Sequence, residues 1–169
     1  MTILFAYDGS ESADAALRAA ASILGAHEAD ATVISVWEPL LVEVFRASKF
    51  GPVGMPTNTA ELDERAEVAA QRVAEQGAQL AGELGFHARP LAIADNRDVA
   101  GAIVAAADDV DADLIVLGAR GLAGVRAYLG SVSNHVLQHA HRPLLVIPPK
   151  GAGRLEEGAH EEASVSQPA

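Results

Sequence analysis

The chain has 169 residues, of which 50% are hydrophobic and 21% charged, so it holds enough apolar material for one compact domain and too little for two. Its 23 acidic and 12 basic side chains give a formal net charge of -11, which disfavours generic nucleic-acid binding. A phosphate ligand must therefore be held locally, by main-chain amides or a helix terminus. The absence of cysteine excludes disulfides, thiolate metal sites and cysteine nucleophiles.

The N-terminal stretch MTILFAYD has neither the basic start nor the long apolar segment of a signal peptide. No part of the sequence approaches the roughly 20 apolar residues that span a bilayer. We therefore expect a cytoplasmic protein with no membrane partner.

Apolar runs and turn residues predict a strand, a helix, a strand, a loop and a helix in the first half of the chain. Residues 3–7 form an apolar run that stops at the turn Asp8-Gly9-Ser10, and Ser10 or Ser12 can cap a helix that ends at Gly25. A second strand is expected at 31–37, followed by a loop over 40–59 that could include a short helix. A long helix follows, weakened by Gly77 and Gly82, with apolar positions at Leu62, Ala66, Ala69, Val73, Leu80 and Leu84.

The second half predicts two more strand and helix pairs and a last strand. We expect a strand at 88–94, a helix after Asp95-Asn96, and a strongly apolar strand at 114–117. A helix then opens at Gly130-Ser131, with Val132, Val136, Leu137 and Ala140 facing inward, and the last strand runs from Pro143 to Ile147. The remainder is polar and acidic, so we expect an α/β domain over residues 1–148 and a disordered tail over 149–169.

Strands that alternate with helices at this spacing predict βαβ units. The expected fold is a single doubly wound α/β domain, Rossmann-like, with a five-stranded parallel sheet and helices on both faces. Ligands bind such sheets at the carboxyl ends of the strands. Asp8-Gly9-Ser10 and the segment from Gly118 to Ser131 should both lie at that edge and face one pocket.

The segment Gly118-x2-Gly121-x8-Gly130-Ser131 predicts an anion site. Glycines let the main chain approach a ligand closely, and a helix N-terminus with a hydroxyl follows. The structural alternative is a tight turn with Ser131 as a helix cap. The segment is not a P-loop, because no Gly-Lys-Ser/Thr follows, and the first turn is not the dinucleotide fingerprint.

Three stretches together resemble the universal stress protein family: residues 3–12, 113–121 and 129–147. The resemblance covers residues 2–148 and implies a five-stranded doubly wound domain that is commonly a homodimer. The nucleotide-binding branch of that family carries Gly-x2-Gly-x9-Gly-Ser/Thr and holds ATP. Here eight residues separate Gly121 from Gly130. Either a surface loop absorbs the missing residue, or the phosphate cradle is lost.

By matching position, the resemblance implies ATP as ligand, with Mg²⁺ or Mn²⁺ as its ion. Asp8 would then lie against the adenosine, although an Asx turn is an equal alternative for it. Arg120 would pair with phosphate or remain a solvated loop charge. The other implied nucleotide-binding residues are Val36 at the adenine, Ala6 and Leu117 as its neighbours, Gly118 and Gly121 along the ribose and phosphates, and Gly130, Ser131 and Val132 at the phosphate oxygens.

The sequence favours a binding protein over an enzyme. No nucleophile is paired with a base, and Lys49 and Lys150 lie outside the glycine segment, so we expect at most slow ATP hydrolysis. His135 and His139 are four residues apart, but no carboxylate lies at the usual spacing, so we expect no metal site.

The predicted function is an ATP-binding regulatory protein of the stress response. The alternatives are a slow ATPase and a nucleotide-free member that acts through protein contacts. The apolar last strand, from Pro143 to Ile147, should pair with a second copy, because it would otherwise leave an exposed sheet edge. A regulatory protein partner is also expected, and the sequence does not identify it.

Overall fold

A computed structural model describes residues 1–25, 29–40, 42, 58–95, 98–119 and 130–148. They form a five-stranded sheet in the order β3-β2-β1-β4-β5, with every neighbouring pair parallel. This architecture confirms the predicted α/β fold. In chain order the elements are β1 Thr2–Ala6, α1 Glu11–Leu24, β2 Asp30–Trp37, α3 Thr59–Glu83, β3 His87–Ala94, α4 Val99–Asp109, β4 Leu114–Gly118, α5 Ser131–His139 and β5 Leu144–Ile147.

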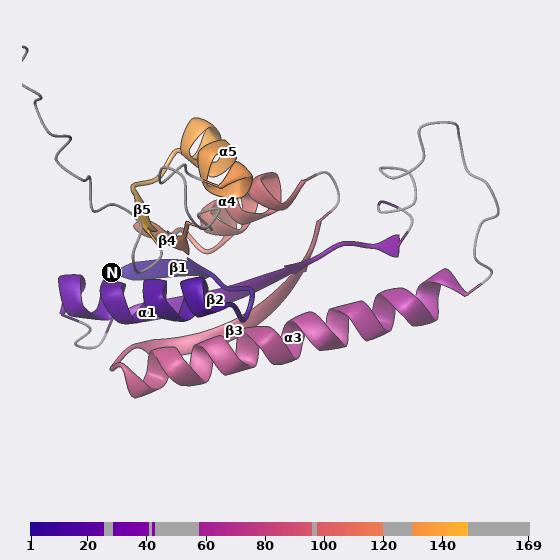
Figure 1. Cartoon of the computed structure of the whole chain (residues 1–169), viewed down its shortest axis with the longest axis horizontal. Coiled ribbons are helices and arrows are strands. Elements are labelled where there is room, and N and C mark those ends of the chain that lie inside the picture. Colours follow the sequence, from indigo (N-terminus) through magenta and orange to yellow (C-terminus); the bar gives the residue numbers. More distant parts are fainter. Residues whose placement is uncertain (26–28, 41, 43–57, 96–97, 120–129, 149–169) are drawn as a thin grey trace, which may run out of the picture.

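Helices cover both faces of the sheet, α1 and α3 on one side and α4 and α5 on the other (Figure 1). Neighbouring residues of a strand point to opposite faces, so β1 supplies both core layers. Phe5 packs on the α1 and α3 side, edge to face with Phe86 at a ring separation of 5.3 Å. Leu4 packs on the other side, with Ile34 and Ile115. Among the described helices, none has both the length and the apolar character that a membrane crossing requires.

The start of α1 is fixed by the turn after β1. The Ser10 hydroxyl accepts a hydrogen bond from the Ala13 amide at 3.2 Å, so Ser10, and not Ser12, is the N-cap. Gly25 ends the helix with a left-handed φ of 61°, as its position predicts.

Helix α3 packs mainly through a stripe of small residues, which corrects part of the predicted apolar face: Val73, Leu80 and Leu84 are half-buried against the core as predicted. Leu62 is 42% exposed and Ala69 is also exposed. A Cβ at Gly77 would lie 2.7 Å from the Tyr7 ring and 2.8 Å from Val33, so this glycine permits the close approach of helix and sheet. The buried residues of the stripe are Ala70, Ala74, Gly77, Ala78 and Ala81.

The face of α5 also differs from the prediction. Val136 is fully buried as expected, but Val132 is 36% exposed and Leu137 is 54% exposed. Ser133 is the other buried residue of this helix. The inward face of α5 is therefore narrower and more polar than its apolar residues indicate. Most of the predicted loop over 40–59 and the whole predicted tail over 149–169 lie outside the described residues.

The β3 edge of the sheet is closed to further strand pairing. The His87 amide, at the start of β3, donates to the Ala29 oxygen, and the Asp95 amide, just after its end, donates to the Trp37 oxygen. The main-chain groups of the odd-numbered residues therefore point to β2, and those of the even-numbered residues point away from the sheet. Of these, Pro90 has no amide hydrogen, and the Ala92 amide donates to the side chain of Gln71 at 3.1 Å. Helix α3 and a proline thus protect this edge.

Candidate functional site

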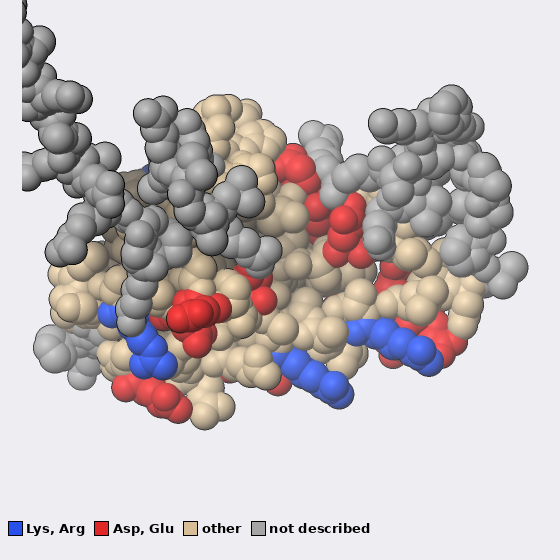
Figure 2. Space-filling view, viewed as in Figure 1, with Lys and Arg blue, Asp and Glu red and all other residues tan. Residues whose placement is uncertain are grey.

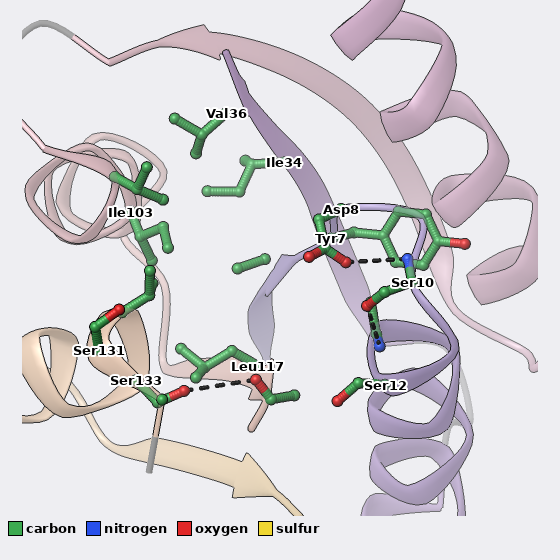
Figure 3. Close-up of a pocket in the computed structure, with 16 residues that line it drawn as sticks. Tyr7, Asp8, Ser10, Ser12, Ile34, Val36, Ile103, Leu117, Ser131 and Ser133 are labelled. Atoms are coloured by element: carbon green, nitrogen blue, oxygen red, sulfur yellow. Dashed lines mark hydrogen bonds between the residues drawn. The ribbon is translucent and has the colours of Figure 1, made fainter. Parts of the chain in front are cut away.

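A pocket of about 370 Å³ opens at the carboxyl ends of β1, β2 and β4 (Figure 3). From β1 the chain adds β2 and β3 on one side of the sheet, and then β4 and β5 on the other side of β1. The direction of strand addition therefore reverses between β1 and β4. Doubly wound sheets bind ligands at this position. The first turns of α1 and α5 and the start of α4 complete the walls.

The structure brings the predicted site residues together as far as it describes them. Arg120 and Gly121 lie outside the described residues. The remaining eight line the pocket: Ala6, Asp8, Val36, Leu117, Gly118, Gly130, Ser131 and Val132. Their contact with a ligand stays a prediction.

Eight further residues line the pocket. Ser10 belongs to the turn that is expected to face the pocket, and the other seven were not predicted: Tyr7, Ser12, Ala13, Ile34, Val99, Ile103 and Ser133. The period of a strand could have found Ile34, because it lies two residues before Val36 on the same face. The helical period predicts Val99 and Ile103 on the apolar face of α4, but no local pattern places them at the pocket, because they reach it only through the packing of α4 on the sheet.

The pocket has an apolar end and a hydroxyl end. Figure 3 shows Ile34, Val36 and Ile103 gathered on one side and Ser12, Ser131 and Ser133 on the other, where Leu117 lies beside Ser133. An aromatic base suits the first end and an oxygen-rich group the second.

Asp8 is the charged residue of the described lining, to which no lysine or arginine contributes. One of its carboxylate oxygens accepts a hydrogen bond from the Ser10 amide at 3.0 Å. This contact is the Asx turn that was predicted as an alternative. Asp8 is nevertheless exposed at the pocket rim. The turn fixes the carboxylate there, and a hydroxyl donor on a ligand can reach it.

Gly118 is required by the packing of β4 against α1. A Cβ at this position would lie 2.6 Å from the main-chain oxygen of Ser12 and 2.7 Å from its hydroxyl oxygen. The Ser12 hydroxyl donates to the Ala119 oxygen at 3.2 Å, and the Ser133 hydroxyl donates to the Gly118 oxygen at 3.5 Å. Two serines thus hold the end of β4 from opposite sides of the pocket.

Helix α5 presents an uncapped N-terminus to the pocket. Its N-cap is Gly130, which offers no side chain, whereas Ser10 caps α1 and Asp98 caps α4. The first hydrogen bond of the α5 ladder comes from Asn134, so the preceding amides have no partner within the helix. These amides and the positive end of the helix dipole favour an anion.

Tyr7 lies at the side of the pocket, and its ring is directed away from the cavity (Figure 3). Its hydroxyl donates to an Asp14 carboxylate oxygen at 2.6 Å. Burial raises the pKa of the Tyr7 phenol to about 12, and the hydrogen bond to Asp14 and the negative charges of Asp14 and Asp8 act in the same direction. Because the fold favours the neutral phenol, its contribution to stability is complete below pH 10 and is lost as the pH rises towards 12.

We expect a spectrophotometric pH titration to detect this shift. One of the two tyrosines should ionise near pH 12, and Tyr7→Phe should remove that step. If the late-ionising phenol persists in Tyr7→Phe, the proposed environment of Tyr7 is wrong.

Comparison with known proteins places the chain in a family. The model of the universal stress protein family matches residues 1–148. A universal stress protein of Thermus aquaticus, encoded in the 3' region of a QAH/OAS sulfhydrylase, is 36% identical over 147 residues, which are 86% of this chain and 97% of the relative. The chain belongs to the universal stress protein family.

Solved structures of universal stress proteins share the fold. One from Burkholderia pseudomallei has a TM-score of 0.63 and 26% identity, over 88% of this chain and 96% of the other. One from Archaeoglobus fulgidus in complex with dAMP has a TM-score of 0.58 and 22% identity, over 87% and 97%. One from Arabidopsis thaliana with AMP bound has a TM-score of 0.60 and 16% identity, over 89% and 93%.

Proposed function

We propose that this protein binds ATP in the pocket between β1, β4 and α5, and acts as a regulatory protein of the stress response. The observation that carries the proposal is one pocket with an apolar end and an uncapped helix N-terminus. The complexes of the related folds with AMP and dAMP support an adenine nucleotide as the ligand. ATP, with Mg²⁺ or Mn²⁺, is the finer part of the proposal.

The described residues fit such a ligand. Ile34, Val36 and Ile103 would hold the adenine, because a flat base buries its faces against branched apolar side chains. The Asp8 carboxylate would accept a hydrogen bond from a ribose hydroxyl. The amides of the first turn of α5 and the Ser131 hydroxyl would donate hydrogen bonds to phosphate oxygens. Main-chain donors would thereby replace the lysine that the described lining lacks.

The charge of the surface supports a local mode of phosphate binding. In the view of Figure 2, basic side chains are scattered over α1 and α3 among acidic ones. With a net charge of -11, the molecule does not attract a polyphosphate from a distance. We therefore propose that affinity comes from short-range donors in the pocket.

Mass analysis of the purified, denatured protein tests the proposal. We expect it to release an adenine nucleotide, and we expect Asp8→Ala to weaken binding by roughly 10- to 100-fold, because one hydrogen bond to a charged group is lost. Asp30→Ala is the matched control, since it also removes an exposed carboxylate, at the opposite end of the sheet, and should retain the nucleotide. Equal retention by both variants would refute the site. A nucleotide-free protein that also fails to bind added nucleotide would favour action through protein contacts alone.

We further propose that a second copy of the chain pairs along β5. The Ile115 and Ala119 amides donate to Pro143 and Ile147, so the main-chain groups of Leu144 and Val146 point away from β4. The opposite edge of the sheet is closed by Pro90 and Gln71, so among the described residues β5 is the edge without such protection. Nucleotide occupancy would act on this dimer or on a protein partner.

Sedimentation of the wild-type chain should give a homodimer. Val146→Pro should give a monomer, because it removes an outward amide without removing a hydrogen bond to β4. Unchanged far-ultraviolet circular dichroism would show that the variant still folds. A wild-type monomer at high concentration, or a dimeric Val146→Pro, would contradict pairing along β5.

A further inference from the structure

Helix α5 carries two exposed histidines, His135 and His139, one turn apart and outside the pocket lining. Their rings meet edge to face, with centroids 4.4 Å apart. The sequence argument against a metal is the lack of a carboxylate at the usual spacing. The fold supplies one from another helix, since Oδ1 of Asp98, the N-cap of α4, lies 3.4 Å from Nδ1 of His135.

Each ring has an acceptor near its Nδ1 atom, within hydrogen-bond distance in His139 and at ion-pair distance in His135. Nδ1 of His139 lies 2.9 Å from the main-chain oxygen of His135. A carbonyl oxygen only accepts hydrogen bonds, so Nδ1 carries the proton, and Nε2 of the neutral ring carries the free lone pair. The Asp98 carboxylate favours the same tautomer in His135. Histidines that bind metals have this arrangement, with the second ring nitrogen donating to a carboxylate or a carbonyl.

We propose that His135 and His139 chelate a divalent transition-metal ion of the zinc type through their Nε2 atoms, with Asp98 as a positioning residue. Residues i and i+4 lie on the same side of a helix, and imidazole suits Zn²⁺, Ni²⁺ and Cu²⁺ better than it suits Mg²⁺. The centroids are 4.4 Å apart, which brings these two exposed side chains close enough to turn their Nε2 atoms towards one ion, held about 2.0–2.1 Å from each nitrogen.

The coordination shell of this site is open. Within the described residues, no group of three or more His, Cys, Asp or Glu side chains could hold a metal ion. Water or a ligand from solution would therefore complete the shell. The two histidines are exposed, so an ion reaches them directly from solvent.

Calorimetric titration of the untagged, chelator-treated protein with Zn²⁺ tests this site. We expect one Zn²⁺ per chain, no comparable heat with Mg²⁺, and at least a tenfold loss of affinity in His135→Ala and in His139→Ala. Asp98→Asn should weaken Zn²⁺ binding by about 10- to 100-fold, as loss of such a partner does. Asparagine also caps helices, so α4 should still form in that variant.

His87→Ala is the matched control. His87 is an exposed histidine whose Nδ1 lies 3.9 Å from Oδ1 of Asp30. It lies on the strand β3, which contains no second histidine. We expect this variant to bind Zn²⁺ as the wild type does. An equal loss in His87→Ala, full binding in either α5 variant, or an unchanged affinity in Asp98→Asn would mean adventitious binding only and would overturn the proposal. The outcome is independent of nucleotide binding, because none of these residues lines the pocket.

Discussion

Ser131→Asp should weaken ATP binding by at least about tenfold without lowering the melting temperature. A carboxylate in the first turn of α5 interacts favourably with the helix dipole, by about 0.3–1 kcal/mol. The same carboxylate would lie where we propose that phosphate binds, and it would replace a donor with a negative charge. The loss of one hydrogen bond to a charged group costs about 1.5–3 kcal/mol, or roughly a factor of 10 to 100 in affinity. Calorimetry and a thermal melt measure the two effects separately.

Two comparisons make the Ser131 result specific. Adenosine carries no phosphate, so its affinity should change little in Ser131→Asp. Asn134→Asp adds the same charge to the same helix at an exposed residue outside the pocket lining, and its effect on ATP should be far smaller. If ATP binds Ser131→Asp as well as it binds the wild type, the phosphates do not lie at this helix terminus.

Gly118→Ala should lower the free energy of unfolding by about 3 kcal/mol and also reduce nucleotide binding. Overpacking of a close contact usually costs about 1–3 kcal/mol, and the upper end is expected here because the new Cβ would meet the main chain of Ser12. Relief of the clash would separate the end of β4 from the first turn of α1. Both elements line the pocket, so its shape would change with them.

Denaturant unfolding of Gly82→Ala provides the control for Gly118→Ala. A Cβ at Gly82 would meet nothing within 4 Å. Because alanine favours a helix more than glycine does, this variant should be more stable by about 0.5–1 kcal/mol. A Gly118→Ala protein as stable as the wild type would show that the contact with Ser12 does not constrain this position.

The parts of the fold that follow from local chemistry could be predicted from the sequence. The apolar run before Asp8, the turn at Gly9 and the hydroxyl of Ser10 act within a few residues of one another, so the first strand and helix follow from them. The carboxyl ends of parallel strands meet at one edge, so Asp8 and Gly118 could be assigned to one pocket before their positions were known.

The faces of the alanine-rich helices could not be predicted in this way. In α3, alanine occurs on several sides, so the buried side is decided by where the sheet allows close approach. Local helix propensity alone predicts that Gly77 destabilises the helix. Its place against Tyr7 and Val33 requires the fold.

Three of the missed pocket residues share one cause. Val99 and Ile103 belong to a helix that is separated in sequence from every predicted motif, and they reach the pocket only when α4 packs on the sheet. Ser133 reads as one more polar residue on a helix surface, yet it is buried and donates to the main chain of Gly118. Long-range packing therefore supplied part of the apolar end and part of the hydroxyl end.

The most direct test of the account is a calorimetric titration of nucleotide-free wild-type protein with ATP and Mg²⁺, and then with AMP and adenosine. We predict one ATP per chain, with an affinity that falls when the phosphates are removed, because main-chain amides at the start of α5 hold them. The absence of any heat and of any shift in melting temperature with all three ligands would contradict the account.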